Sequence, residues 1–163
     1  MTGPGKGKTT AALGVILRSL SCGRKTLLAR FGKSRNSGEL DILAKLPGME
    51  IRNSSLGMAP PPGHPEREHY ARAASDLFAA VMENTDRFDT LVLDEACWAV
   101  ASGLLSEKKV IEWTKALPAD RIVVLTGRDA TAGLIAVADT VSEVLSLKHG
   151  YARGIAAQEG IEY

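Results

Sequence analysis

The chain has 163 residues, of which 45% are hydrophobic and 24% charged, so it can bury the core of one globular domain. Twenty Lys and Arg against 19 Asp and Glu give a formal net charge of +1 without long blocks of like charge, which favours small-molecule partners over nucleic acid or an anionic membrane. Cys22 and Cys97 lie outside any metal-binding spacing, and no apolar run approaches the ~20 residues that span a bilayer, so we expect a single cytoplasmic domain over residues 1–163.

The first predicted element is a glycine-rich loop that runs directly into a helix. Its residues are Gly3, Pro4, Gly5, Lys6, Gly7, Lys8, Thr9 and Thr10. Closely spaced glycines let backbone N–H groups turn inward, and the helix that follows presents its positive dipole end. We therefore predict a phosphate-binding loop, in a variant form, because the usual spacing would have glycine where Thr2 stands. The alternative is a glycine-rich turn that merely begins a helix.

Within this loop, side chains are expected to add to what the backbone supplies. Lys8 holds the position from which a lysine reaches the outer phosphates, and a hydroxyl of Thr9 or Thr10 can bind Mg²⁺. Lys6 could add charge to the site or be a solvated loop residue.

Hydrophobic spacing predicts the elements of the first half of the chain. Leu13, Ile16, Leu17 and Leu20 repeat at helical spacing, and Gly23 follows as a stop. We expect short strands at 26–31 and 49–52 with a brief helix at 39–46 between them. Three consecutive prolines exclude regular structure from 57–65, and apolar spacing over 70–81 then predicts an amphipathic helix.

Two continuous apolar runs, 91–93 and 122–125, read as buried parallel strands in the second half. Helices are expected at 110–117 and 134–138. Strands that alternate with helices indicate an α/β fold, a mostly parallel sheet flanked by helices. The polar residues Asp94, Glu95, Thr126 and Arg128 should gather at the carboxyl edge of this sheet, where such folds bind ligands.

Asp94 and Glu95 are the candidate metal carboxylates. Mg²⁺ prefers oxygen and commonly takes one or two carboxylates together with phosphates and waters. The alternative is that one of the two caps the following helix or pairs with Lys8 for structural reasons.

Other reactive residue types receive structural interpretations. His64 and His69 are expected to face solvent or cap the helix at 70–81, because no third ligand joins them at useful spacing. We interpret Trp98 and Trp113 as core or interface anchors. No catalytic role is assigned to Cys97, which lacks a recognisable base.

Several blocks, in order along the chain, together resemble the P-loop type of the ATP:corrinoid adenosyltransferase family. They are residues 2–14 with Arg18, Leu93-Asp94-Glu95, Leu125-Thr126-Gly127-Arg128, residues 138–143, Lys148-His149 and residues 154–163. The resemblance implies a P-loop NTPase-like fold, RecA-like in its arrangement. It also implies transfer of the 5′-deoxyadenosyl group of ATP to the Co(I) centre of a corrinoid, with triphosphate as the leaving group.

Residue roles carried over from the family are expectations. Lys8, Glu95 and Arg128 would be catalytic, and Thr9, Glu95 and Asp94 would hold Mg²⁺ or Mn²⁺. The nucleotide-binding set would be Gly3, Gly5, Lys6, Gly7, Lys8, Thr9, Thr10, Arg18, Arg128, Lys148 and His149. The family further implies a homodimer and a flavoprotein reductant.

This sequence departs from the family pattern in two places. Only Met1 and Thr2 precede the loop, where the family has a strand, so we expect either an upstream start or a sheet without its first strand. A Gly-Phe-x-Trp aromatic pair is replaced by Gly57-Met58-Ala59-Pro60, with loss of the aromatic wedge. Two alternatives therefore stay open: a Mg²⁺-dependent ATPase or phosphotransferase, and a nucleotide-binding paralogue that does not transfer adenosyl groups.

Overall fold

The computed structural model describes residues 1–33, 38–54, 56–150, 154–158 and 160–161. Its elements, in chain order, are α1 (Lys8–Ser21), β1 (Thr26–Arg30), α2 (Gly38–Leu43), β2 (Met49–Asn53), α3 (Arg67–Glu83), the 3-10 helix η1 (Thr85–Arg87), β3 (Thr90–Asp94), α4 (Ala96–Ala101), α5 (Glu107–Ala116), β4 (Ile122–Leu125) and α6 (Ala132–Val137). Of the closing sequence block, Glu159, Glu162 and Tyr163 lie outside the described residues.

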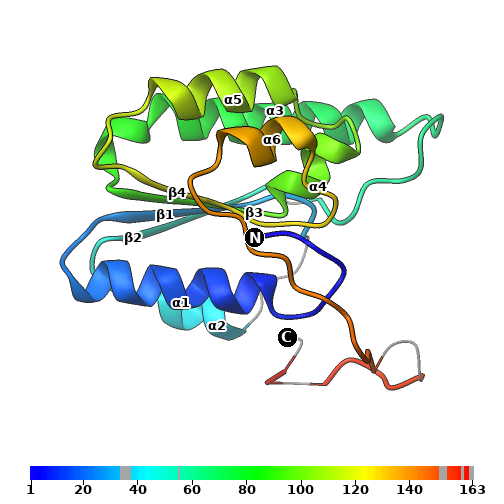
Figure 1. The fold of residues 1–163 in the computed structure, drawn as a ribbon, viewed down its shortest axis with the longest axis horizontal. Helices are drawn as coiled ribbons and strands as arrows, with labels where there is room; N and C mark the ends of the chain where they lie inside the picture. The colour runs from blue at the N-terminus through cyan, green and yellow to red at the C-terminus, as the bar shows by residue number, and fades with distance from the viewer. Residues whose placement is uncertain (34–37, 55, 151–153, 159, 162–163) are drawn as a thin grey trace.

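The centre of the fold is a four-stranded sheet in the order β2-β1-β3-β4. All three strand pairs are parallel, and in their register Ala29 stands opposite Leu93, which stands opposite Leu125. Figure 1 shows α1 and α2 on one face and α3 to α6 on the other. This is the predicted α/β architecture, with all carboxyl ends of the strands at one edge.

Both faces of the central strands are apolar, which explains the continuous hydrophobic runs in the sequence. Leu27 and Leu91 face the larger cluster under α3, α4 and α5, whereas Leu28 and Val92 face the smaller one with Ile16 of α1. All five are at most 1% exposed. Because side chains alternate along a strand, a strand covered on both faces must be apolar at every position.

An aromatic pair anchors the larger cluster. The ring centroids of Phe78 and Trp113 are 5.4 Å apart in an edge-to-face arrangement. The buried indole N–H of Trp113 donates to Thr85 Oγ1 at 3.0 Å. Trp113 is thus a core residue, as predicted, and Trp98 packs at the margin of the same cluster.

The remaining element predictions are confirmed with shifts at the ends. The helix expected at 39–46 ends at Leu43, because the chain tightens into turns before Pro47. Neither helix nor strand forms over the described proline-rich residues 57–65. His64 and His69 are exposed, and His64 Nδ1 accepts the Glu66 N–H just before α3.

Within residues 1–33, no strand precedes α1. Thr2 instead forms a single parallel bridge with Glu143. The Met1 ammonium donates to the carbonyl of Leu125 at the end of β4, 2.8 Å away. The chain after α6 returns past the start of α1 before it leaves the body of the molecule (Figure 1).

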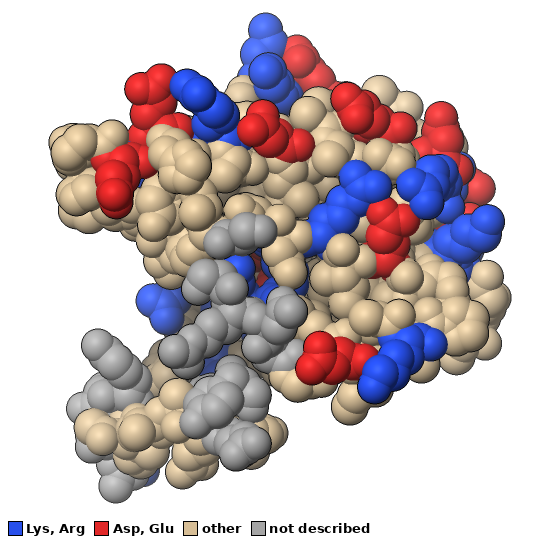
Figure 2. Space-filling view, turned by 180° about the vertical axis from the view of Figure 1, so that it is seen from behind, with Lys and Arg blue, Asp and Glu red and all other residues tan. Residues whose placement is uncertain are grey.

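Charged side chains of both signs are interspersed over the upper and right-hand parts of the face shown in Figure 2. No helix among the described residues is long and apolar enough to cross a membrane.

Candidate functional site

The glycine loop, residues 3–7, wraps around the side chain of Lys8. Gly3 and Gly7 adopt left-handed backbone angles, with φ of 100° and 111°. Lys8 is only 7% exposed, and its Nζ donates to the carbonyl oxygens of Gly3 and Gly5, each at 2.7 Å. A positive charge is therefore held inside the loop. It lies at the amino-terminal end of α1, where the N–H groups of the first turn lack partners within the helix.

A strip of backbone after α6, residues 142–145, supports the outside of this loop. Thr2 exchanges hydrogen bonds with it, donating to Ser142 O at 2.9 Å and accepting from Val144 N at 2.8 Å. The Gly5 N–H donates to Val144 O at 2.7 Å. Since the Gly5 amide is used in this way, the amides expected to reach phosphate are those after it.

Glycine is required at position 5 because the backbone strip lies too close for a side chain. A Cβ at Gly5 would lie 2.6 Å from Leu145 O and 2.7 Å from Val144 O. We predict that Gly5→Ala displaces the loop and weakens ATP binding at least about tenfold, or by about 1.4 kcal/mol. Isothermal titration calorimetry would measure the change.

Gly14→Ala is the matched control for this substitution. Gly14 lies in α1, and a Cβ there would meet nothing within 4 Å. Alanine at this site should leave ATP affinity unchanged and raise the free energy of unfolding by about 0.5–1 kcal/mol through helix propensity. Equal ATP affinities of the two variants would contradict the supporting role of residues 142–145.

Asp94, at the carboxyl end of β3, is the most buried charge of the site, with 0% exposure. Its Oδ1 accepts from Thr9 Oγ1 at 2.9 Å and from Thr126 Oγ1 at 2.6 Å. Its Oδ2 accepts from Lys33 Nζ at 2.7 Å. Hydrogen bonds from three different segments thus hold one carboxylate next to the loop helix.

Glu95 follows in an unusual backbone conformation, with φ of 62°. Its N–H donates to Thr126 Oγ1 at 3.0 Å, and it occupies the N-cap position of α4. Its side chain makes no capping hydrogen bond, so the helix-capping alternative accounts for its position but not for its carboxylate.

The two carboxylates of the site interact electrostatically with three cations, Lys8, Lys33 and Arg128. Burial, and then the charge of Asp94, raise the pKa of the Glu95 carboxyl, while Lys33, Lys8 and Arg128 oppose the rise. The pKa of Lys8 is lowered mainly by burial. Hydrogen bonds confirm the predicted gathering of Asp94, Glu95 and Thr126 at the sheet edge, and the charge of Arg128 acts to lower the pKa of Lys8 and of Glu95.

Thr126 connects the two acidic residues, and its removal is a test of the arrangement. It is fully buried, and its hydroxyl serves Asp94 and the Glu95 N–H at once. Thr126→Val should therefore lower the free energy of unfolding by roughly 2 kcal/mol. Thr126→Ser, which keeps the hydroxyl and loses one methyl, should cost about 1 kcal/mol. Urea denaturation that gives both variants the same midpoint would contradict this role.

The oxygen donors present suit a hard divalent cation. The Thr9 hydroxyl bonds to Asp94, and Glu95 is the next residue along the chain, so one hydroxyl and two carboxylates come from neighbouring positions. Among the described residues, no group of three or more His, Cys, Asp and Glu side chains is arranged to hold a metal ion without ligands of other types. This set fits Mg²⁺, which is held by one or two carboxylates and completes its shell with phosphates and waters.

The other predicted site residues are spread more widely. Lys6 is exposed on the loop, and Thr10 is exposed on the first turn of α1. Arg18 lies in the last turn of α1, roughly 15 Å along the helix axis from Lys8 at 1.5 Å per residue, so the structure does not bring it to the loop. Lys148 is exposed and His149 partly buried, just beyond the strip that supports the loop.

Sequence reasoning missed Lys33 as a site residue. Its ammonium contacts both Thr9 Oγ1, at 2.8 Å, and Asp94 Oδ2. The available signal was its place just after the strand β1, since ligands bind at the carboxyl ends of parallel strands.

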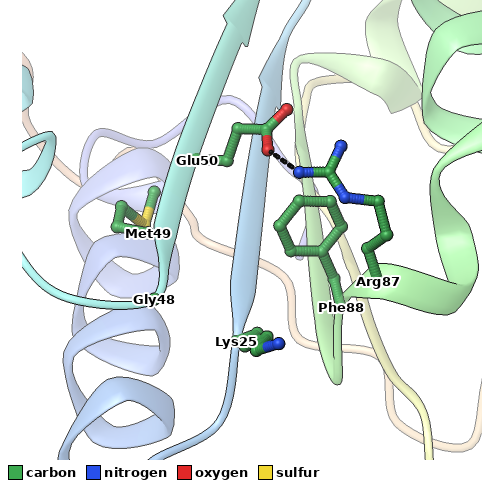
Figure 3. Close-up of a pocket in the computed structure, with 6 residues that line it drawn as sticks. All are labelled: Lys25, Gly48, Met49, Glu50, Arg87 and Phe88. Atoms are coloured by element: carbon green, nitrogen blue, oxygen red, sulfur yellow. Dashed lines mark hydrogen bonds and ion pairs between the residues drawn. The ribbon is translucent and has the colours of Figure 1, made fainter.

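A separate hollow of about 290 Å³ lies at the opposite, amino-terminal edge of the sheet (Figure 3). It is lined by Lys25, Gly48, Met49, Glu50, Arg87 and Phe88. Arg87 pairs with Glu50 at 3.0 Å and lies over the ring of Phe88. Its cation is thus already balanced, and the hollow is remote from the loop.

A parallel sheet flanked by helices, with a glycine loop and an acidic pair at its carboxyl edge, is the P-loop NTPase-like class of α/β protein. The sequence model of one family, described as ATP:corrinoid adenosyltransferase BtuR/CobO/CobP, matches residues 1–163. The chain belongs to this family.

Named relatives agree with this membership. The corrinoid adenosyltransferase CobA of Salmonella typhimurium is 34% identical over 163 residues, which cover 99% of this chain and 83% of the relative. The Pseudomonas aeruginosa corrinoid adenosyltransferase is 34% identical over 166 residues, 99% of this chain and 81% of the relative. The Escherichia coli corrinoid adenosyltransferase is 32% identical, with 99% and 83% covered.

Proposed function

We propose that this protein transfers the 5′-deoxyadenosyl group of ATP to the Co(I) centre of a corrinoid. The observation that carries the proposal is the family match over the whole chain. In this reaction the electron pair of Co(I) forms a bond to the 5′ carbon of ATP. The bond between that carbon and its oxygen breaks, triphosphate leaves with the electron pair, and cobalt becomes formally Co(III).

The protein needs no catalytic base in this reaction, because cobalt is itself the nucleophile. Its tasks are to align cobalt with the 5′ carbon and to stabilise negative charge on the departing triphosphate. The buried Lys8 ammonium and the amides at the start of α1 supply positive charge for the second task. We propose that the triphosphate lies in the glycine loop with the adenosyl end outside it.

A magnesium or manganese ion is the proposed cofactor, held by Thr9, Glu95 and Asp94. Such an ion supplies positive charge to the phosphate oxygens when bound. The residues themselves bring the donors together: the Thr9 hydroxyl bonds to Asp94, and the backbone conformation at Glu95 sets the position of that residue.

Arg128 is the proposed second cation on the nucleotide. Its positive charge acts to lower the pKa of Lys8 and of Glu95, which supports a place beside these residues. Arg18, Lys148 and His149 are proposed to contact the nucleotide or close the site on the resemblance alone. Because Arg18 lies far from the loop, the contact proposed for it is with the part of the nucleotide farthest from the triphosphate.

The corrinoid is proposed to lie against the proline-rich loop at 57–65. This loop follows the carboxyl end of β2, so it rises from the same edge of the sheet as the glycine loop. Arg67 holds it in place with hydrogen bonds to the carbonyls of Pro60 and Ser102. Met58 is 58% exposed and offers apolar surface in place of the aromatic wedge.

The family also supports a homodimer, a flavoprotein that reduces the corrinoid, and a cytoplasmic location as parts of the proposal. None of these changes the chemistry that Lys8 and the acidic pair are proposed to perform.

Product analysis tests the proposed function. The protein is incubated without oxygen with Mg²⁺, ATP and chemically reduced cobalamin, and products are followed by absorbance and phosphorus NMR. Adenosylated cobalamin and triphosphate are expected in equal amounts. ADP would identify an ATPase or phosphotransferase, and ATP binding without turnover would identify a paralogue that has lost the transfer reaction.

A further inference from the structure

Lys33 bonds directly to two of the three residues that would hold the metal. Its Nζ lies 2.8 Å from Thr9 Oγ1, on the loop helix, and 2.7 Å from Asp94 Oδ2, at the end of β3. The ammonium therefore bridges two segments of chain through one oxygen of each. A divalent cation bound by Thr9 and Asp94 would bridge the same pair.

Charge balance explains why an ammonium is found there. Asp94 has 0% side-chain exposure, and a buried carboxylate is costly unless a cation compensates it. The Lys33 side chain is 28% exposed, so one end of this ion pair is fixed in the core while the other faces solvent. A lysine carries its charge on a flexible four-carbon stem, which allows it to turn away without moving the backbone.

The backbone conformation just before Lys33 directs this side chain toward the loop helix. Gly32, just after β1, has φ of 70°, and a Cβ there would lie 2.5 Å from a ring atom of Trp98. This glycine lets the chain turn closely against Trp98 as it leaves the sheet, which directs Lys33 across to the loop helix.

We propose that Lys33 is a positioning residue whose ammonium occupies the metal position when no nucleotide is bound. It preserves the arrangement of Thr9 and Asp94 in the empty site. When the metal and the triphosphate arrive, the ammonium withdraws from both oxygens and turns toward the phosphates. This inference rests on the proposed metal–nucleotide site but not on the transfer to cobalt.

Binding of Mn²⁺ alone tests the proposal, because it requires neither ATP nor corrinoid. Free Mn²⁺ is measured by electron paramagnetic resonance during titration of the wild-type protein, Lys33→Met, Lys33→Gln and Lys33→Arg. Removal of the competing ammonium should tighten Mn²⁺ binding at least about tenfold in the Met and Gln variants. Lys33→Arg keeps a cation and should stay near wild type. Lys115→Met, at an exposed position on α5, is the matched control and should not differ from wild type.

Thermal unfolding provides the second measurement. Without metal, Lys33→Met should melt below the wild type, because Asp94 Oδ2 loses the ammonium that it bonds to. Added Mn²⁺ should raise the melting temperature of this variant more than that of the wild type. Unchanged or weaker Mn²⁺ binding in the Met and Gln variants would overturn the proposal, as would variants that fail to fold even with Mn²⁺. If these results hold while product analysis finds no adenosyl transfer, the proposed function fails and the role of Lys33 stands.

Discussion

Lys8→Ala should weaken ATP binding about 100-fold or more, equivalent to about 2.8 kcal/mol. The ammonium is buried within the glycine loop and bonds to two of its carbonyls, so the substitution removes the positive charge that lies inside the loop. Isothermal titration calorimetry with Mg²⁺ and ATP is the measurement. A protein that binds ATP with unchanged affinity after this substitution would refute the phosphate-binding role of the loop.

The variant should nevertheless remain folded, which makes the loss specific to the ligand. Burial lowers the pKa of Lys8, so the ammonium is held at a cost in the empty protein, and alanine removes that cost together with two hydrogen bonds. Lys6→Ala is the matched control in the same loop. Since Lys6 is exposed, its removal should reduce affinity less than about fivefold through screened charge.

Glu95→Gln should have opposite effects on metal dependence and on stability. Loss of a metal carboxylate should raise the Mg²⁺ concentration needed for half-maximal ATP binding about tenfold. Substitutions around metal sites commonly weaken metal affinity by at least this factor. The nucleotide-free variant should be more stable than the wild type near neutral pH, because an uncharged amide replaces a carboxylate whose ionised form is disfavoured by burial and by Asp94.

The pH dependence of this stability difference follows from the direction of the pKa shift. A carboxyl with a raised pKa in the folded protein destabilises it only where the unfolded chain is ionised, that is, above the ordinary pKa of 4.5. The penalty grows as the pH rises from there to the folded pKa and is constant above it. Melting temperatures measured between about pH 5 and about pH 8 should therefore show the advantage of Glu95→Gln narrowing on acidification. Glu83→Gln, at an exposed position on α3, is the control. A variant less stable than wild type at the alkaline end would contradict the burial of this charge.

The sequence predicted those parts of the fold that local pattern determines. Strands β1, β3 and β4 are covered on both faces or flanked by helices, so their residues form apolar runs that stand out against the polar turns. The helix α3 carries one apolar stripe, with Leu77, Phe78 and Val81 buried. By contrast, α4 has only six residues and begins directly after the acidic pair Asp94-Glu95, and so short a helix shows no hydrophobic period of its own.

The site was predictable where residues follow strands and unpredictable where distant segments meet. Asp94 and Thr126 end neighbouring parallel strands, so their contact follows from topology. Lys33 joins Asp94 across 61 positions of sequence, a separation over which hydrophobic spacing predicts no contact. The support of Gly5 by Val144 likewise comes from a return of the chain that hydrophobic spacing does not encode.

The most direct measurement of the central claim uses ATP that carries heavy oxygen at the atom bridging the 5′ carbon and the α-phosphorus. If the loop around Lys8 holds the triphosphate and leaves the 5′ carbon open to Co(I), the bond between that carbon and its oxygen breaks, and mass spectrometry finds the label in triphosphate. Label retained in ADP, AMP or another product that still contains adenosine would show that a phosphorus–oxygen bond breaks instead, and would contradict the account.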